Sequence, residues 1–199
     1  MGTTRIRVRL GLVRGHLAAA LDRAPAGPVR LLSLCAGQGR DVLGVLPEHP
    51  RGPDVSAVLV ENDPRNAALA RDGAARAGLP RVEVRQADAA RVAGYADALP
   101  ADVLLLCGIF GNVSDEDIER TAAAASALCA PGATVIWTRH RRPPDLTPRI
   151  RGWLRAAGFD EVAFDTPDTE ALTGVGVGRL AVPPPSGLPA GPLFTFRAA

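Results

Sequence analysis

The chain has 199 residues, enough for one domain with a single sizeable core. Hydrophobic residues make up 47%, which excludes an intrinsically disordered chain, and no apolar run reaches the roughly 18 residues of a membrane-spanning helix. All 23 basic residues are arginine, which excludes a Schiff-base lysine and the lysine of a P-loop. The formal net charge is only +2, with acidic and basic residues interleaved, so a nucleic-acid partner is not expected.

The ends of the chain and its cysteines carry little further information. Residues 1–5 lead into an arginine-punctuated segment instead of the apolar core of a signal peptide, so we expect a cytoplasmic protein without membrane contact. The three cysteines, Cys35, Cys107 and Cys129, show no Cys-x-x-Cys spacing. Neither a disulfide framework nor a metal site is therefore predicted.

The first predicted element is an amphipathic helix from Ile6 to Leu21. Apolar residues recur there every three to four positions, with arginines between them. We assign residues 1–27 to this helix and its connection, packed on a core formed by residues 28–199.

Strands and helices alternate through most of the remaining chain. In chain order they are predicted at 29–35 (strand), about 40–46 (helix), 57–61 (strand), 64–77 (helix), 82–85 (strand), about 89–96 (weak helix), 103–106 (strand), 114–129 (helix), 134–137 (strand) and 149–157 (helix). Pro64 suits the first turn of its helix, and Ser114, with Asp117 three residues later, is typical of a helix cap. Five strands alternating with helices predict a parallel sheet covered on both faces.

The end of the chain breaks this alternation. The last two strands are predicted at 162–164 and 193–196, joined by a Gly/Pro-rich stretch at 173–192 without a clear helix. This favours a terminal hairpin over another strand–helix–strand unit.

The turn after the first strand is the most informative segment. It reads Cys35-Ala36-Gly37-Gln38-Gly39, and its glycines let the backbone pass close to a ligand. Free amides at the start of the following predicted helix suit a carboxylate or a phosphate. Glu61 ends the next strand at close to the 20-residue spacing at which an acidic residue meets ribose hydroxyls.

Asp88 follows the third strand, where its carboxylate can accept a hydrogen bond from an adenine amino group. A dinucleotide-binding fold more often shows Gly-x-Gly-x-x-Gly, and here Val42 stands at the third glycine position. A nicotinamide enzyme is therefore disfavoured.

These elements, followed by residues 102–108 and 131–136, resemble the ordered motifs of class I, Rossmann-like methyltransferases that use S-adenosylmethionine. The resemblance extends over about residues 31–196. It implies an α/β fold with one doubly wound Rossmann-like domain and a seven-stranded, mostly parallel sheet. The implied strand order is 3-2-1-4-5-7-6, with the last strand antiparallel.

The resemblance also implies S-adenosylmethionine as the cofactor and a role for each matching position. Cys35, Ala36, Gly37, Gln38 and Gly39 would surround its methionine part, Glu61 its ribose, Asn62, Asp88 and Ala89 its adenine, and Cys107 and Gly108 its sulfonium side. Two positions depart from the family pattern. Ser33 stands where the family often has an acid, and Cys35 stands at the first glycine of the usual motif.

Catalytic residues are not identified by any motif. Methyl transfer from a sulfonium is a direct displacement that positioning can accelerate, so a base is not required. The candidates are His140 as a base, Asn112 to orient an acceptor, and Arg139, within the cluster at 139–142, to meet an anionic substrate. For each of them, an exposed turn or rim residue is the alternative interpretation.

We therefore expect a methyltransferase acting on a small-molecule acceptor. The enzymatic alternative is a nucleic-acid or protein methyltransferase, although no Asn-Pro-Pro-Tyr stretch follows the fourth strand. The departures at Ser33 and Cys35 favour a non-catalytic module that binds S-adenosylmethionine, and a nucleotide-cofactor oxidoreductase is a further alternative. Little chain precedes the first strand to form a lid, so the acceptor site is expected to be open or completed by a partner chain, as in a homodimer.

Overall fold

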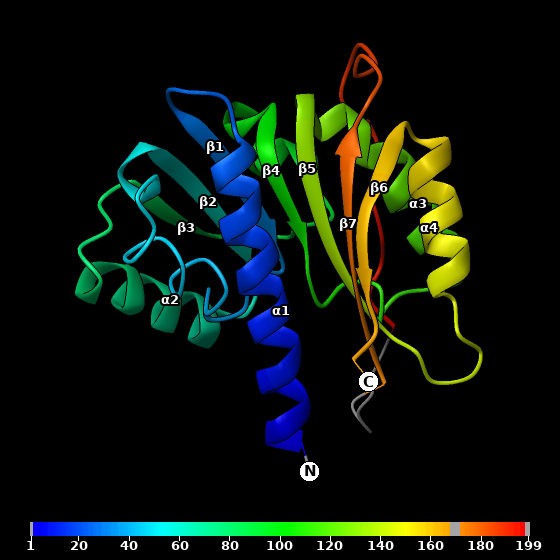
Figure 1. The fold of residues 1–199 in the computed structure, drawn as a ribbon, viewed down its shortest axis with the longest axis horizontal. Helices are drawn as coiled ribbons and strands as arrows, with labels where there is room; N and C mark the ends of the chain where they lie inside the picture. Colours follow the sequence, from blue (N-terminus) through cyan, green and yellow to red (C-terminus); the bar gives the residue numbers. More distant parts are fainter. Residues whose placement is uncertain (1, 168–171, 198–199) are drawn as a thin grey trace.

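A computed structural model describes residues 2–167 and 172–197, with side chains from residue 7 onward. The chain forms one sheet with helices on both faces (Figure 1). The strands are β1 (Val29–Leu34), β2 (Val55–Glu61), β3 (Val82–Gln86), β4 (Ala101–Leu106), β5 (Cys129–His140), β6 (Phe159–Asp165) and β7 (Thr173–Leu180). The α-helices are α1 (Gly2–Arg23), α2 (Pro64–Arg76), α3 (Asp115–Ala124) and α4 (Thr147–Ala156), and short 3₁₀ turns lie at Gly52–Asp54, Val92–Gly94, Ala96–Ala98 and Ala125–Leu128.

The seven-stranded sheet has the order β3-β2-β1-β4-β5-β7-β6, as expected. β1 to β5 pair in parallel, while β7 is antiparallel to both of its neighbours. The strand order reverses between β1 and β4. In an open α/β sheet, ligands bind at such a reversal, beyond the carboxyl ends of the strands.

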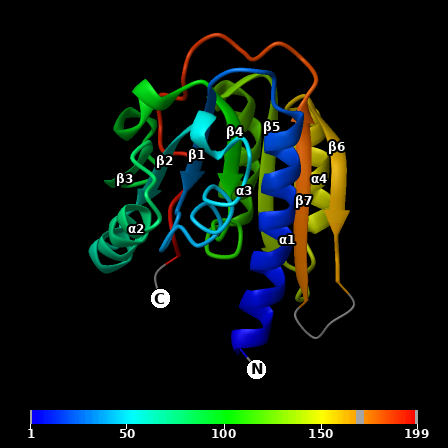
Figure 2. The ribbon, with the colours of Figure 1, turned by 60° about the vertical axis from the view of Figure 1, so that its left-hand side comes forward.

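Each face of the sheet has its own apolar core. α1 packs on one face through Val13, Leu17 and Leu21, all of which are buried, and α2 lies on the same side. α3 and α4 cover the opposite face. The amino-terminal turns of α1 project past the carboxyl ends of the parallel strands, as Figures 1 and 2 both show. A helix wall therefore stands beside the end of the sheet where a ligand is expected.

β7 corrects the expectation of a loop at 173–192. Val175 and Val177 alternate with glycines and are buried, which is the period-two pattern of a strand. A Cβ built on Gly176 would lie 2.2 Å from Cε2 of Trp137, and the Trp137 and Phe164 rings stack with centroids 5.6 Å apart. β7 requires glycine at Gly174 and Gly176 because the rings of Phe164 and Trp137 fill the space that side chains at these positions would occupy.

The expectation of a last strand at 193–196 is wrong. Leu193 and Phe194 are buried in the core beneath α3 and α4, but they do not join the sheet. The Leu193 amide donates to the Ala90 carbonyl at 2.9 Å, and Phe196 forms an isolated bridge with Val113. An apolar segment that packs on loops has the same local pattern as a short strand.

The expected helix at about 40–46 is also absent, and successive turns occupy residues 40–48. Arg14 of α1 donates two hydrogen bonds, of 3.0 and 2.6 Å, to the Arg40 carbonyl, which a helix would use for the Gly44 amide. The Asp41 side chain accepts from the amide of Val42 at 2.9 Å. Both contacts compete with a regular helical pattern.

Two other helices differ from expectation for a similar reason. The weak helix at about 89–96 is replaced by 3₁₀ turns, because the Tyr95 hydroxyl donates to the Ala89 carbonyl and the Leu193 amide takes the carbonyl of Ala90. The helix that begins after Ser114 ends as α3 at Ala124 and tightens into a 3₁₀ turn before β5.

Candidate functional site

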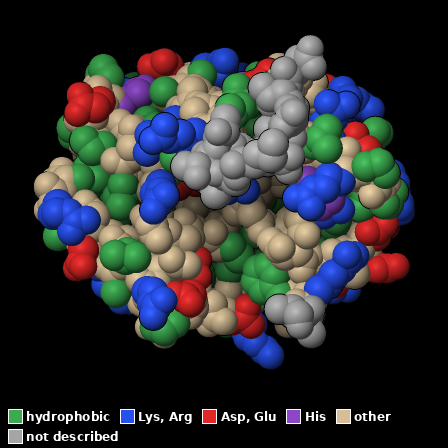
Figure 3. All heavy atoms as spheres, turned by 90° about the horizontal axis from the view of Figure 1, so that it is seen from below, with side chains coloured by type: hydrophobic (Ala, Val, Ile, Leu, Met, Phe, Trp, Pro, Cys, Tyr) green, Lys and Arg blue, Asp and Glu red, His purple; other side chains and the backbone are tan. Residues whose placement is uncertain are grey.

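The candidate site lies where the parallel strands end. Figure 3 views the molecule from this side, and its described surface is hollowed near the centre. β1, β2, β3 and β4 all end there, so the segments that follow them come together although they are far apart in the sequence.

The turn after β1 has an unusual backbone. Cys35, Gly37 and Gly39 have φ angles of 56°, 57° and 65°, in the left-handed region that glycine tolerates best. A Cβ built on Gly37 would meet nothing within 4 Å, whereas one on Gly39 would lie 2.8 Å from Cδ1 of Leu59. Gly37 therefore leaves open space for a ligand, while Gly39 allows the turn to pack on β2.

Glu61 fastens this turn to the end of β2. Its Oε2 accepts a hydrogen bond from the Gly37 amide at 2.7 Å, and its Oε1 accepts one from the Asp63 amide at 2.9 Å. Asp63 in turn caps α2 by accepting from the Asn66 amide at 2.8 Å. The position of the Glu61 carboxylate is therefore fixed by backbone groups on both sides.

The residues expected at an adenine lie next to Glu61. The Ala87 amide donates to the Glu61 carbonyl at 3.2 Å, which brings the end of β3 beside the end of β2. Asp88 is exposed and accepts from the Ala90 amide at 2.9 Å, Ala89 is buried, and Asn62 is exposed.

Gln38 lies beside the same group of residues. Its amide nitrogen donates to Asn66 at 3.3 Å, and its oxygen accepts two hydrogen bonds from Arg40, at 3.0 and 2.7 Å. The Gln38 side chain is therefore used to hold the turn after β1 against α2.

β4 contributes Cys107 and Gly108. Gly108 has a φ of 86°, its amide donates to Thr138 Oγ1 at 3.1 Å, and a Cβ built there would meet nothing within 4 Å. Burial raises the pKa of the Cys107 thiol, and the Asp41 carboxylate adds to that rise. Burial, together with the carboxylates of Glu61 and Asp88, raises the pKa of Cys35 to about 12.

The three acceptor-side candidates follow β4 and β5. The Asn112 side chain is exposed, and its amide donates to the Gly108 carbonyl at 2.7 Å. Arg139 is buried and donates to the Phe110 carbonyl, so it is not part of a solvated rim and instead supports the segment after β4. His140 lies beside Gly111, and its buried Nδ1 has no hydrogen-bond partner among the described residues.

Burial lowers the pKa of His140 below its ordinary value, and the charges of Arg139 and Arg142 add to this effect. The imidazole is therefore neutral at pH 7 and able to accept a proton. Arg141 pairs with Asp145 at 3.3 Å, so only part of the basic cluster at 139–142 is available to a substrate.

Sequence analysis assigned no role to Asp41 or to Arg9, whose charges both act on the Cys107 thiol at the end of β4. Asp41 is 8% exposed and lies directly after the glycine turn. The sequence showed that Asp41 lies close to the glycine turn, but it did not indicate that the side chain is buried.

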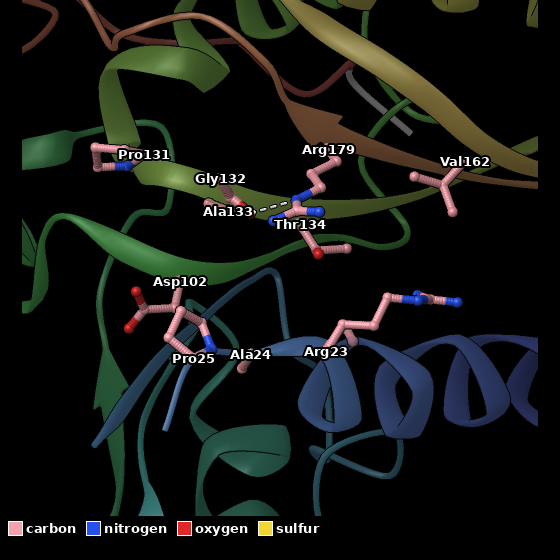
Figure 4. A pocket seen from close by; sticks show the side chains of 11 residues that line it. Arg23, Ala24, Pro25, Asp102, Pro131, Gly132, Ala133, Thr134, Val162 and Arg179 are labelled. Carbon is pink, nitrogen blue, oxygen red and sulfur yellow. Dashed lines mark hydrogen bonds between the residues drawn. The ribbon is translucent and has the colours of Figure 1, made fainter. Parts of the chain in front are cut away.

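Cavities at the opposite end of the sheet are less suitable for a cofactor. One of about 30 Å³ lies where β4 and β5 begin (Figure 4), and it holds little more than a water molecule. Two of its charged groups are already used, because Arg179 donates to the Gly132 carbonyl and Asp102 accepts from the Arg30 amide. A second cavity, of about 330 Å³, lies at the start of β2 and β3 and has a mostly apolar lining.

Among the residues that the structure describes, no group of three or more His, Cys, Asp or Glu side chains is arranged to hold a metal ion. None of the described helices is long and apolar enough to cross a membrane.

Comparison with known proteins gives matches at the level of structure alone. No protein-family model matches the sequence, and no curated protein matches it. An O-methyltransferase family protein from Burkholderia thailandensis matches with a TM-score of 0.68 and 18% identity, over 88% of this chain and 56% of its own. The chain therefore spans little more than half the length of that protein.

Two further solved structures match over most of both chains. Magnesium protoporphyrin IX methyltransferase from Synechocystis, with bound S-adenosylmethionine, has a TM-score of 0.71 and 12% identity, over 89% of this chain and 83% of its own. An RNA methyltransferase from Salinibacter ruber, in complex with S-adenosylhomocysteine, has a TM-score of 0.56 and 20% identity, over 86% and 94%. With the sheet order and the antiparallel β7, these matches establish that the chain has the class I, Rossmann-like methyltransferase fold.

Proposed function

We propose that this protein is an S-adenosylmethionine-dependent methyltransferase that acts on a small-molecule acceptor. The observation that carries the proposal is the Glu61 carboxylate, held between the Gly37 and Asp63 amides beside a glycine that faces open space. An acid fixed at the end of β2 is suited to the paired hydroxyls of a ribose.

The residues present fit such a cofactor. Each Glu61 oxygen accepts one backbone hydrogen bond and keeps a further acceptor position, so the carboxylate can take both ribose hydroxyls. The spaces beside Gly37 and Gly108, which a Cβ would fill, are suited to the methionine part and the sulfonium side. In this proposal the exposed Asp88 carboxylate, which accepts from the Ala90 amide, and the backbone at Ala89 would meet the adenine.

When bound, the cofactor supplies a methyl group on a positively charged sulfur. The residues of this chain would position the acceptor opposite that methyl group, which is the main source of acceleration in a direct displacement. Thr138 and Arg139 hold the segment after β4 through the Gly108 amide and the Phe110 carbonyl, and this segment carries Asn112 toward the acceptor side. His140 in its neutral form is the available base.

The two thiols at the site favour an external acceptor. The thiolate is the nucleophilic form of cysteine, and a raised pKa keeps the thiol protonated near neutral pH. Both Cys35 and Cys107 have raised pKa values. Neither is therefore a competing target for the methyl group.

Charge supports a small acceptor over a nucleic acid. The net charge of +2 is low for a protein that binds a phosphate backbone, and several arginines are paired with carboxylates, as Arg85 is with Glu83 and Asp97. The similarity to an RNA methyltransferase keeps nucleic acid as the alternative to be tested.

Two measurements test the proposal. Calorimetry with S-adenosylmethionine, S-adenosylhomocysteine and NAD should show binding of the first two and none of NAD. Tritiated methyl transfer should then be followed into a panel of small phenols and carboxylic acids, into total RNA and into a protein extract. Label in the small-molecule fraction supports the proposal, and label in RNA or protein favours the alternative. Binding without any transfer indicates a non-catalytic module, and binding of NAD alone contradicts the assignment.

A further inference from the structure

An open cavity between α1 and α2 is lined by three arginines. It measures about 260 Å³, and its walls come from α1, from residues 38–44 and from α2. Figures 1 and 2 both show the turns at 40–48 between the two helices. Gly73 and Arg76 of its lining belong to the second half of α2, which leads from the end of β2 toward the start of β3. The cavity therefore extends along α2, away from the strand ends of the candidate site.

The three arginines, Arg14, Arg40 and Arg76, have no acidic partner among the described residues. Arg14 donates to the Arg40 carbonyl at 3.0 and 2.6 Å, and Arg40 donates to Gln38 Oε1 at 3.0 and 2.7 Å. Both acceptors are neutral. Arg76 makes no hydrogen bond or ion pair with a described residue, and Nη1 of Arg14 and of Arg40 donates to none. Three positive charges with unused donors thus face one small space.

Other arginines of the chain are paired with carboxylates. Arg151 lies 2.5 Å from Glu161, and Arg85 lies 2.6 Å from Asp97. The charge of Arg14 does act on the Asp41 carboxylate, but Asp41 is buried and does not line the cavity. Like charges that gather without an acid repel one another, and a bound anion removes that repulsion.

Two glycines shape the walls of the cavity. A Cβ built on Gly44 would overlap the Arg14 guanidinium, and one on Gly73 would lie 2.8 Å from Cδ1 of Leu43. Gly44 therefore lets the guanidinium lie against the turn, and Gly73 lets α2 approach Leu43. Leu43 and Leu69, of which Leu69 is 42% exposed, add an apolar surface beside the arginines.

We propose that this cavity binds a small phosphate monoester, with its phosphate between the three guanidinium groups and its organic part on Leu43 and Leu69. A phosphate monoester carries up to two negative charges and has three acceptor oxygens, so it balances more of the arginine charge than a carboxylate does. Guanidinium–phosphate hydrogen bonds are among the stronger ones in proteins. A small ligand suits the size of the cavity, and the low net charge of +2 disfavours a nucleic-acid backbone. The site is separate from the proposed cofactor site and does not depend on the proposed function.

The test uses phenyl phosphate as the probe, measured by calorimetry at low ionic strength. The wild-type protein should bind it more tightly than inorganic phosphate, which lacks an apolar part, and more tightly than benzoate, which carries a single charge. Arg40→Gln and Arg76→Gln should each weaken phenyl phosphate by about fivefold or more. Leu69→Ala should weaken phenyl phosphate and leave inorganic phosphate unchanged.

A matched control separates the site from a general effect of charge. Arg155 is an exposed arginine in the last turn of α4, as Arg76 is in the last turn of α2, but α4 lies on the opposite face of the sheet. Arg155→Gln should therefore leave the affinity for phenyl phosphate unchanged. Circular dichroism verifies that each variant is folded, and Arg76→Gln tests the proposal by itself if the Arg40 variant does not fold.

The outcomes separate this inference from the proposed function. Absence of phenyl phosphate binding, tighter binding of benzoate, or an equal loss in Arg155→Gln would overturn the phosphate site. Displacement of the probe by saturating S-adenosylhomocysteine would also overturn it, because the probe would then occupy the cofactor site. Binding of a single-stranded RNA oligonucleotide that Arg40→Gln and Arg76→Gln weaken, without binding of phenyl phosphate, would replace the small ligand by a nucleic acid. Binding of S-adenosylhomocysteine without the probe tests the proposed function independently.

Discussion

Replacement of Glu61 by alanine removes two hydrogen bonds that hold the site together. Oε2 accepts from the Gly37 amide at 2.7 Å and Oε1 from the Asp63 amide at 2.9 Å. Hydrogen bonds to a charged group are worth about 1.5–3 kcal/mol when buried, and Glu61 is only partly buried, so the lower value applies. We expect the free energy of unfolding to fall by about 1–3 kcal/mol, which for a chain of this size lowers the melting temperature by about 2–12 °C.

The same change should weaken the cofactor more specifically. Loss of the acceptor for two ribose hydroxyls predicts a decrease in S-adenosylhomocysteine affinity of about 1.5–3 kcal/mol, or roughly 10- to 150-fold. Glu61→Gln should have a smaller effect, because one oxygen still accepts while the amide nitrogen meets a backbone donor.

Calorimetry on protein that is folded by circular dichroism measures this change. Glu83→Ala is the matched control, since Glu83 is an exposed acid on the neighbouring strand that pairs with Arg85 at 2.8 Å. It should leave the dissociation constant unchanged. A folded Glu61→Ala variant with wild-type affinity would remove the ribose assignment.

Three further changes give separate expectations. Gly37→Val should abolish S-adenosylhomocysteine binding in calorimetry, because the added side chain would occupy the open space proposed for the ligand and because valine rarely adopts a φ of 57°. Retained affinity would contradict this expectation. Gly176→Ala should lower the free energy of unfolding in urea by about 1–3 kcal/mol, because the added Cβ meets Trp137 at 2.2 Å, whereas Gly191→Ala, with nothing within 4 Å, should change it little. His140→Ala should leave cofactor affinity unchanged and reduce turnover, by roughly 10²–10⁴ where it acts as the base. Since its pKa is lowered, wild-type activity should rise with pH and reach half of its maximum below the ordinary histidine value of 6.5, and a midpoint above that value would exclude His140 as the titrating group.

Much of the framework was determined by the sequence alone, because it depends on contacts between near neighbours in the chain. The cap at Ser114 accepts from the Asp117 amide at 3.1 Å, and α2 begins at Pro64, both as expected. The strands from β1 to β5 were recognisable as apolar runs between turns. The positive φ angles at Gly37 and Gly39 agree with the glycine pattern, and Glu61, which was predicted to bind the ribose of the same cofactor, lies beside that turn.

The elements that the sequence did not predict are those decided by distant partners. Residues 40–48 form turns because Arg14 of α1 takes the Arg40 carbonyl. β7 is a strand rich in glycine because Trp137 fills the space beside Gly176, and a glycine-rich segment carries the same local signal as a loop.

The candidate site likewise contains some features that the sequence predicted and others that only the tertiary structure decided. The glycine turn and Glu61 are local features of strand ends, so their spacing could be read along the chain. The burial of Arg139 and of Asp41 depends on how α1 and the segments after β1, β4 and β5 pack together. Only the tertiary structure could decide these, because the energy of a buried charge is determined by neighbours that lie far away in the sequence.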